Sequence, residues 1–164
     1  MLIGHAHVFG DFINTDEHAS EKYKPAGTPV EIIQRDLFSA IRPGFSQQVA
    51  KGDFLVAGKG FGTVSSRVDA AINIKAIGIA AVLAQSFGIL FYRNAPNAGL
   101  PCIECDTSRI SEGDRLEIDL DAGEISNLSN GEKLSFMPYP KVIQTILHDG
   151  GLLEHIRLHG GYAL

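Results

Sequence analysis

The chain has 164 residues, of which 45% are hydrophobic and 20% are charged, and its formal net charge is −5. This length and composition exclude a largely disordered chain and predict a single domain spanning residues 1–164. The acidic balance argues against nucleic acid as a partner, and two cysteines are too few for a disulfide framework. We expect a cytoplasmic protein without a signal peptide or a membrane-spanning segment, because its apolar runs are short.

The first part of the chain predicts strands that alternate with helices. The strands are predicted at residues 2–9, 54–57, 79–84 and 100–105. The helices are predicted at residues 29–41, 65–77 and 86–94. Thr28 and Pro29 favour the start of the first helix, because a hydroxyl caps a helix and proline fits its first turn. Strands that alternate with helices pair in parallel through right-handed crossovers.

The pattern changes after residue 114. Residues 115–120 alternate between apolar and charged side chains, which predicts a half-exposed strand. Residues 124–128 and 134–137 continue it as antiparallel hairpins, with Asn-Gly at 130–131 as a turn. A last helix is expected over residues 140–159, interrupted at two glycines. The predicted fold class is therefore α/β, with a mostly parallel central sheet and added antiparallel hairpins.

The most informative segment is residues 58–67, Gly-Lys-Gly-Phe-Gly-Thr-Val-Ser-Ser-Arg, which joins a predicted buried strand to a predicted helix. Its glycines let the backbone approach a ligand, and a helix start offers unpaired amide groups to an anion. Arg67 adds a guanidinium that binds a carboxylate or phosphate through two parallel hydrogen bonds. The segment lacks the lysine of a phosphate-binding loop and the glycine spacing of a dinucleotide-binding loop. Its spacing favours an anion site over the alternative, a structural turn in which Ser65 caps the helix.

Six segments, spread over nearly the whole chain, form an ordered set of motifs. They are residues 9–16 (Phe-Gly-Asp-Phe-Ile-Asn-Thr-Asp), 42–45 (Arg-Pro-Gly-Phe), 52–59 (Gly-Asp-Phe-Leu-Val-Ala-Gly-Lys), 61–67 (Phe-Gly-Thr-Val-Ser-Ser-Arg), 76–95 and 150–154 (Gly-Gly-Leu-Leu-Glu). In order and spacing this set resembles the small subunit of 3-isopropylmalate dehydratase, which is equivalent to the swivelling fourth domain of aconitase.

This resemblance implies a swivelling β/β/α domain that pairs with a separate large subunit holding a four-iron–four-sulfur cluster. The two chains would close over a 2-hydroxy dicarboxylate or tricarboxylate and isomerise it by dehydration and rehydration, most simply 3-isopropylmalate in leucine biosynthesis. By position, Ser65 would be the base that removes a proton from carbon, Ser66 would hydrogen-bond the substrate and Arg67 would clamp a carboxylate. The loop residues that would shape the site are Gly60, Phe61, Gly62, Thr63 and Val64. No cofactor is expected in this chain itself.

Three positions depart from the family signature Asn-Phe-Gly-x-Gly-Ser-Ser-Arg-Glu. Gly60 stands in place of the asparagine, Val64 in place of a glycine and Val68 in place of the acidic residue. A β-branched residue resists positive φ, so the loop must differ here if the family's glycine uses that conformation. The departures leave three alternatives: a different substrate (homoaconitate, citraconate or a methylated malate), a remodelled but active loop, or a non-catalytic paralogue that binds carboxylates.

Two further groups fall in segments covered by the resemblance. Lys24 is the only cation of residues 23–28, where the family places its substrate-choice loop. It would meet a distal carboxylate of the substrate unless it is a solvated surface lysine. Asp16 and His18 would contact the substrate or the partner subunit, or Asp16 would organise the turn around Thr15, and the sequence leaves these alternatives open.

Two pairs of side chains have metal-ligand chemistry. Cys102 and Cys105 lie three apart in a predicted strand and point to opposite faces, so buried thiols are favoured over a zinc or redox pair. His155 and His159 lie four apart near a helix end, where they would bind a metal or interact with the helix C-terminus. We favour the helix interaction and assign no metal ligand.

The remaining candidates carry less information. His5 and His7 share one face of a strand, but no carboxylate partner is evident nearby, so they are assigned no function. Tyr92 and Arg93 would face the site or the partner, unless Arg93 is a cation at a helix C-terminus. An isolated chain is also expected to form homo-oligomers through the apolar surface that would otherwise meet the large subunit.

Overall fold

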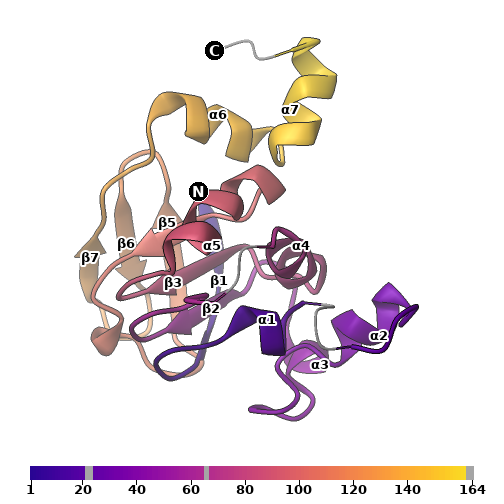
Figure 1. Ribbon diagram of the computed structural model, residues 1–164. Coiled ribbons are helices and arrows are strands. Elements are labelled where there is room, and N and C mark those ends of the chain that lie inside the picture. The colour runs from indigo at the N-terminus through magenta and orange to yellow at the C-terminus, as the bar shows by residue number, and fades with distance from the viewer. Residues whose placement is uncertain (21–23, 65–66, 162–164) are drawn as a thin grey trace.

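A computed structural model of the chain describes residues 1–20, 24–64 and 67–161. Within these residues a seven-stranded sheet has the strand order β4-β3-β2-β1-β5-β6-β7. The strands are Leu2–Val8 (β1), Phe54–Ala57 (β2), Ala81–Ala84 (β3), Cys102–Glu104 (β4), Arg115–Asp119 (β5), Glu124–Asn127 (β6) and Lys133–Ser135 (β7). Strands β1 to β4 pair in parallel, whereas β5 to β7 pair antiparallel and join the sheet beside β1. The predicted α/β class with added hairpins is confirmed (Figure 1).

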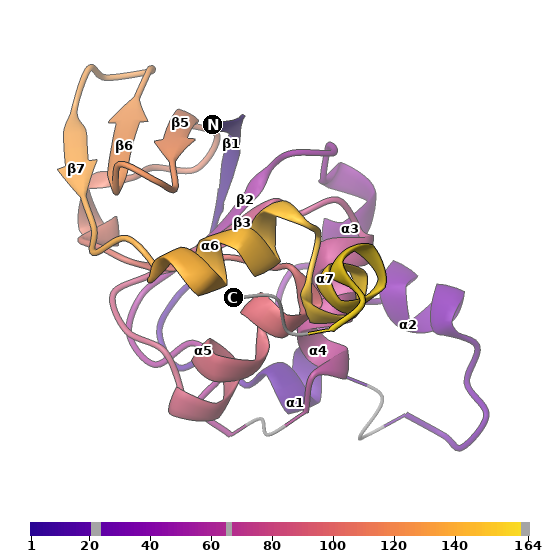
Figure 2. The ribbon, with the colours of Figure 1, turned by 90° about the horizontal axis from the view of Figure 1, so that it is seen from above.

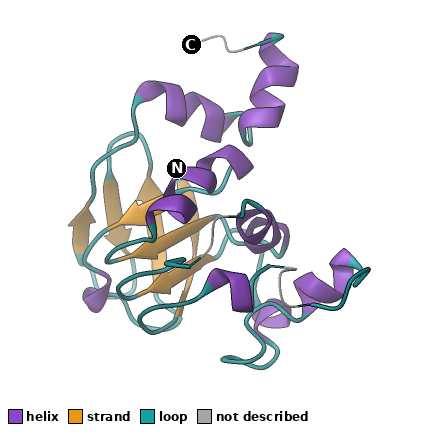
Figure 3. Cartoon of the chain, in the orientation of Figure 1, coloured by secondary structure: helices purple, strands orange, loops and turns teal. Residues whose placement is uncertain are grey.

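Most of the helices lie on the side of the parallel strands (Figure 3). The helices are Thr15–His18 (α1), Val30–Arg35 (α2), Phe45–Gln48 (α3), Asp69–Ala76 (α4), Ile89–Asn94 (α5), Lys141–His148 (α6) and Leu152–His159 (α7), with 3₁₀ turns at Pro96–Ala98 (η1) and Thr107–Arg109 (η2). Helices α6 and α7 cover the end of the molecule at which α5 and η1 lie (Figures 1 and 2). None of the described helices has the length and apolar character needed to cross a membrane.

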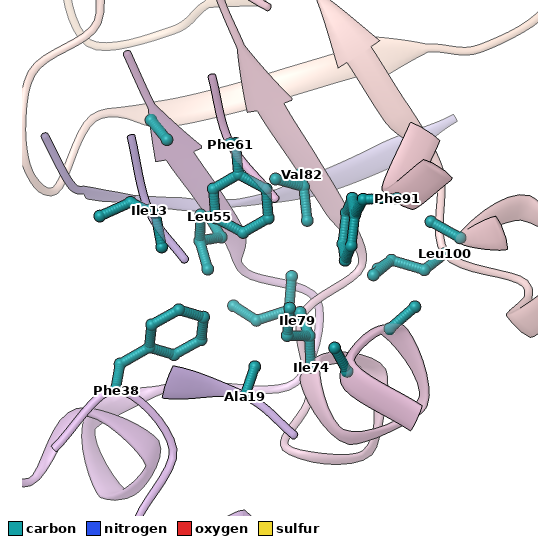
Figure 4. Close-up of a cluster of buried hydrophobic side chains, with 14 of the residues drawn as sticks. Ile13, Ala19, Phe38, Leu55, Phe61, Ile74, Ile79, Val82, Phe91 and Leu100 are labelled. Carbon is teal, nitrogen blue, oxygen red and sulfur yellow. The ribbon is translucent and has the colours of Figure 1, made fainter. Parts of the chain in front are cut away.

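Strands β2 and β3 are buried along their whole length, as strands covered on both faces are. One set of their side chains packs against the helices, and Figure 4 shows Leu55, Phe61 and Val82 pointing toward Ile74 and Ile79. The alternate set packs against the antiparallel strands, so that Val56 and Leu83 share a cluster with Ile118 and Ile125. The sheet must therefore curl, because residues from distant positions in the strand order share one core.

The helix predicted over residues 29–41 is wrong in its extent, because α2 ends at Arg35. Phe38 has a positive φ of 57°, which a continuing helix excludes. Its ring is fully buried against Phe9 and Phe45, so packing of this side chain replaces the helix with a turn. Thr28 is not the predicted cap, because its hydroxyl donates to the carbonyl of Pro25.

The helix predicted from residue 65 begins later, at Asp69, with Val68 as its first flanking residue and without a side-chain cap. Ser65 and Ser66 lie outside the described residues, and so does the prediction that Ser65 caps the helix. The helix predicted over 86–94 begins at Ile89, because Ser86 and Gly88 instead hydrogen-bond the neighbouring loop. The interruption at two glycines is confirmed, since α6 and α7 lie on either side of it.

Candidate functional site

The loops that follow β1, β2 and β3 meet at one edge of the parallel sheet. Three backbone hydrogen bonds join the first two loops: Gly58 N–H to Gly10 O (3.2 Å), Phe12 N–H to Lys59 O (2.7 Å) and Gly62 N–H to Ile13 O (2.8 Å). Ligands of open α/β sheets bind outside the carboxyl ends of the strands, which is this edge. The glycine-rich segment therefore lies where the fold places a ligand.

Two side chains of the loop after β1 contact the glycine-rich segment. Asp11 Oδ1 accepts a hydrogen bond from the Lys59 amide at 2.7 Å. Phe12, in a left-handed conformation with φ of 54°, lays its ring against Gly60, where an added Cβ would come within 2.7 Å of it. The Gly-Asp pair at 10–11 is the signal for this contact in the sequence, and the structure adds Asp11 and Phe12 to the residues that support the loop.

The loop after β3 also hydrogen-bonds the glycine-rich segment. Phe61 N–H donates to Ser86 O (3.0 Å) and Gly88 N–H donates to Phe61 O (2.8 Å). The Gly60 amide donates to the Ser86 hydroxyl at 3.0 Å. The Phe61 ring is fully buried and meets Phe87 and Phe91 edge-on. Burial of Phe61 thus fixes the inner end of the loop, a packing role rather than a ligand contact.

Two glycines of the loop are required by its conformation. Gly60 and Gly62 have φ values of 68° and 74°. A Cβ at Gly62 would lie 2.6 Å from Phe91, closer than packed atoms allow. Among described residues other than glycine, only Phe12 and Phe38 have positive φ, so Val64 does not adopt the conformation that a β-branched residue resists. This chain accommodates Val64 without left-handed strain.

The outer end of the loop faces solvent. Thr63, Val64 and Arg67 are exposed, in contrast to the buried Phe61. Arg67 lies two residues before α4, where Asp69 is an acidic residue of the first turn. A guanidinium held at the end of a rigid loop can bind a carboxylate through paired hydrogen bonds. The structure therefore shows Arg67 exposed just before α4, and its contact with a carboxylate stays a prediction.

Lys24 lies elsewhere, beside the end of α2. The Arg35 side chain hydrogen-bonds Asp36 and lowers the pKa of that carboxyl, and the charge of Lys24 contributes in the same direction. The role of Lys24 toward a substrate stays a prediction.

The sequence matches the family described as the aconitase C-terminal domain over residues 14–108. Relatives align over nearly the full length: a 3-isopropylmalate dehydratase small subunit of Archaeoglobus fulgidus is 44% identical over 93% of this chain and 94% of its own. A small subunit from Thermotoga maritima is 40% identical over 99% and 98% of the two chains. The chain belongs to the 3-isopropylmalate dehydratase small-subunit family.

A solved structure of this family agrees with the fold. The crystal structure of 3-isopropylmalate dehydratase from Methanocaldococcus jannaschii superposes with a TM-score of 0.87 at 37% identity, covering 97% of this chain and 95% of the other. The resemblance predicted from six motifs is therefore confirmed for the fold and the family. Among curated relatives, the isopropylmalate/citramalate isomerase small subunit of the same organism is 40% identical over 96% of this chain and 94% of its own.

In this small-subunit chain, Asp16 is buried at the start of α1. Asn14 caps the helix by accepting a hydrogen bond from the Asp16 amide at 3.1 Å, and Ser20 donates to the Asp16 carbonyl at 2.9 Å. Both contacts use backbone groups of Asp16, so the alternatives for its carboxylate stay open. His18 is half-buried and its ring stacks on Phe38.

The prediction that His5 and His7 lack a carboxylate partner is wrong. His7 Nε2 lies 2.9 Å from Asp53 Oδ2, and His5 Nδ1 lies 3.6 Å from Asp53 Oδ1. Burial alone would raise the pKa of Asp53, but hydrogen bonds from the His5 amide, His7 and the Ala50 amide outweigh it and lower the pKa. Parallel pairing of β1 with β2 creates this contact between residues 46 positions apart, which no local pattern reveals.

The prediction of two buried cysteines in one strand holds for Cys102, whereas Cys105 is only partly buried and lies just after β4. Cys102 packs in the core on the helical side of the sheet, whereas Cys105 packs against the opposite cluster. Burial raises the pKa of Cys102 well above its usual value and that of Cys105 to about 12. Both thiols are therefore protonated at neutral pH, which disfavours metal binding and redox exchange. Arg93 lines a pocket with Tyr92 and Tyr139.

Proposed function

We propose that this chain is the small subunit of a two-chain hydro-lyase that isomerises a 2-hydroxy dicarboxylate or tricarboxylate, with 3-isopropylmalate in leucine biosynthesis as the substrate. Membership of the small-subunit family supports the reaction class. The observation that supports a site at this edge is the glycine-rich loop at the carboxyl ends of the parallel strands, held by the buried Phe61 and followed by the exposed Arg67. We also infer that the chain acts as one swivelling domain over residues 1–164, in the cytoplasm.

The resemblance assigns the chemical roles residue by residue. Ser65 is the base that takes a proton from carbon, while Ser66 hydrogen-bonds the substrate and Arg67 clamps a carboxylate. Loss of that proton and of the hydroxyl gives an unsaturated acid and water, and water adds back with the hydroxyl moved. Arg67 neutralises charge that develops on the carboxylate during proton removal, which makes the carbon acid stronger. Lys24 is proposed to meet a distal carboxylate.

The four-iron–four-sulfur cluster is proposed to belong to the large subunit. Iron–sulfur clusters are held by several cysteine thiolates, whereas this chain has two cysteines, whose pKa values are raised by burial. This donor set does not fit a cluster. Bound by the large subunit, the cluster would supply a Lewis acid for the leaving hydroxyl.

The surface around the loop supports a partner subunit at this edge. Apolar side chains are exposed next to it, on the loop itself and on α4 and α5: Val64, Val68, Ile72, Ile89 and Leu90. Ligand sites usually bury most of the ligand surface, whereas Arg67 on this chain is open to solvent. A second protein surface is needed to complete the site. The same apolar residues would mediate homo-oligomers of the isolated chain.

Citramalate-type substrates are the second candidate. The relative from Methanocaldococcus jannaschii is named an isopropylmalate/citramalate isomerase small subunit. Residues 25–27 of this chain, Pro-Ala-Gly, are small at the position of the family's substrate-choice loop. Other possible substrates are homoaconitate, citraconate and methylmalate-type acids. A further alternative is that the chain is a non-catalytic paralogue that binds carboxylates.

Anaerobic reconstitution with a family large subunit tests the proposal. The assay offers 3-isopropylmalate, citramalate, homoaconitate and their unsaturated products to each chain alone and to the pair. We expect turnover only from the pair, with the best substrate identifying the pathway. Complex formation without turnover on any substrate would favour the binding-only paralogue, and Val64→Gly is then the variant to test for restored activity. Failure of the chains to associate would contradict the small-subunit assignment.

A further inference from the structure

The C-terminal corner of the molecule brings together two histidines and an aspartate. Asp149 follows α6, while His155 and His159 lie on α7, which is joined to α6 by two glycines (Figure 1). Asp149 Oδ2 lies 2.6 Å from His155 Nδ1 and 3.0 Å from His159 Nε2. Two imidazoles thus converge on a single carboxylate oxygen.

The spacing of these atoms matches what a transition metal ion requires. One ligand atom from each of the three residues lies within 4.8 Å of the other two. Zinc binds nitrogen and oxygen at about 2.0–2.2 Å, so that ligand atoms on one ion lie roughly 3–3.5 Å apart. His155 and His159 are one helical turn apart on the same face, and their ring centroids are 4.6 Å apart. The 2.6 Å separation between Asp149 and His155 is a hydrogen bond, so these two atoms must move apart by a few tenths of an ångström to share one ion.

The three side chains differ in how much of each is exposed to solvent. The side chain of His155 is 1% exposed, that of Asp149 19% and that of His159 40%. A buried ligand fixes the site, whereas the exposed one leaves an open position for entry of an ion and for a bound water. Three protein ligands and one water form the usual four-coordinate open zinc site.

We propose that Asp149, His155 and His159 form a binding site for a divalent transition metal ion of the zinc type, with water as the fourth ligand. The carboxylate and the two neutral imidazoles bind through lone pairs, and each imidazole keeps one proton on the nitrogen turned away from the ion. This replaces the interpretation from the sequence, in which the two histidines only complement a helix C-terminus. That interpretation left out Asp149, because only the turn at residues 150–151 brings it to α7.

The site would clamp the C-terminal helices to each other. The adjacent Gly150 carbonyl accepts a hydrogen bond from Lys75 Nζ at 2.7 Å, and the same ammonium donates to Ala98 O at 3.1 Å. A metal held by Asp149 and α7 therefore ties the end of α6 to α7, next to the contact that fixes this corner on α4 and η1. Binding of an ion to the folded state alone raises the thermal midpoint.

The test uses the full chain without an affinity tag, treated with chelator and titrated with zinc chloride by calorimetry. We expect one ion per chain and a higher Tm in the presence of zinc. His159→Gln and Asp149→Asn should each weaken binding by at least about tenfold and reduce the Tm shift. His148→Gln is the matched control, because His148 is an exposed histidine adjacent to Asp149 that faces Asp121 instead.

Cobalt substitution checks which side chains bind the ion. Nitrogen and oxygen ligands give ligand-field absorption without a thiolate charge-transfer band, and we expect that spectrum. A thiolate band would assign the ion to the cysteines and overturn the proposal. The proposal also fails if zinc does not bind saturably, or if His159→Gln binds it as tightly as the unaltered chain.

Discussion

The parallel and antiparallel halves of the sheet differ in burial and in what their connections carry. Every residue of β2 and β3 is buried, whereas β5, β6 and β7 alternate between covered and exposed side chains. The loops after the parallel strands hold the glycine-rich segment, while the antiparallel strands are joined by short turns (Figure 2). The candidate site thus lies on the half that contains the two completely buried strands.

The two halves also differ in the range of the contacts that shape their loops. Asp11 and Lys59, which hydrogen-bond at the candidate site, are 48 residues apart. In the β6–β7 turn, Gly131 N–H donates to Asn127 O and Glu132 N–H donates to Asn130 Oδ1. The antiparallel turn is therefore shaped by its own sequence, whereas the candidate site depends on long-range packing. The predictions below pair a change in one half with a matched change in the other.

The largest expected effect is on turnover. Ser65→Ala should lower kcat of the reconstituted enzyme by about 10²–10⁴-fold, the usual contribution of a general base, while KM changes little. Ser135→Ala, at an exposed position of β7, should leave kcat unchanged. Steady-state kinetics of both variants with the large subunit measure this contrast. Normal turnover of Ser65→Ala would remove Ser65 from the role of base.

The next effect is on stability at two glycines with positive φ. Gly62→Ala combines left-handed strain with a clash against Phe91 and should lower the free energy of unfolding by about 2–5 kcal/mol. Gly131→Ala has a similar φ of 80° but open space around it, so only about 1–2 kcal/mol of strain is expected. Urea denaturation of both variants measures the difference. Equal losses would show that the contact with Phe91 relaxes freely.

The smallest effect concerns two aspartates whose pKa values are lowered in the folded chain. Asp53 is almost buried and accepts three hydrogen bonds, so Asp53→Asn should cost about 1–3 kcal/mol near neutral pH. Asp119 is half-buried and accepts hydrogen bonds from the Ala122 and Asp121 amides, which lower its pKa. An asparagine oxygen can accept both of these bonds, so Asp119→Asn should change stability little.

The pH dependence follows from the direction of the Asp53 shift. A carboxyl with a lowered folded pKa stabilises the protein above its unfolded pKa of about 3.9, and this contribution is lost as pH falls through the folded value. Acid unfolding below about pH 4 should therefore be less steep in Asp53→Asn than in the unaltered chain. Denaturation midpoints at several pH values measure it, and identical slopes would contradict the role of Asp53.

Much of the fold was predictable because its signals are local. The apolar runs predicted β2 and β3, the alternation after residue 114 predicted β5, and the Asn-Gly at 130–131 predicted the turn before β7. The paired glycines at 150–151 correctly divided the last helix. In each case hydrophobic periodicity or a turn residue sufficed, because these features do not depend on distant partners.

The errors share a physical cause, which is packing between segments far apart in the chain. Phe38 has a non-helical conformation that places its ring in an aromatic cluster, and α2 is therefore shorter than predicted. Ser86 and Gly88 hydrogen-bond the glycine-rich loop, so α5 begins only at Ile89. Tertiary contacts outweigh helix propensity here, since propensity differences are below about 1 kcal/mol per residue.

The sequence by itself determined the α/β class, the family motifs and the glycine-rich loop with Arg67, because these are patterns of neighbouring residues. Only the tertiary structure decided which side chains hold that loop, that Asp53 lies against His7, and that Asp149 joins His155 and His159. Hydrogen bonds and metal-ligand geometry act over about 2–3.5 Å. Such contacts arise only after strand pairing and helix packing have brought distant segments together.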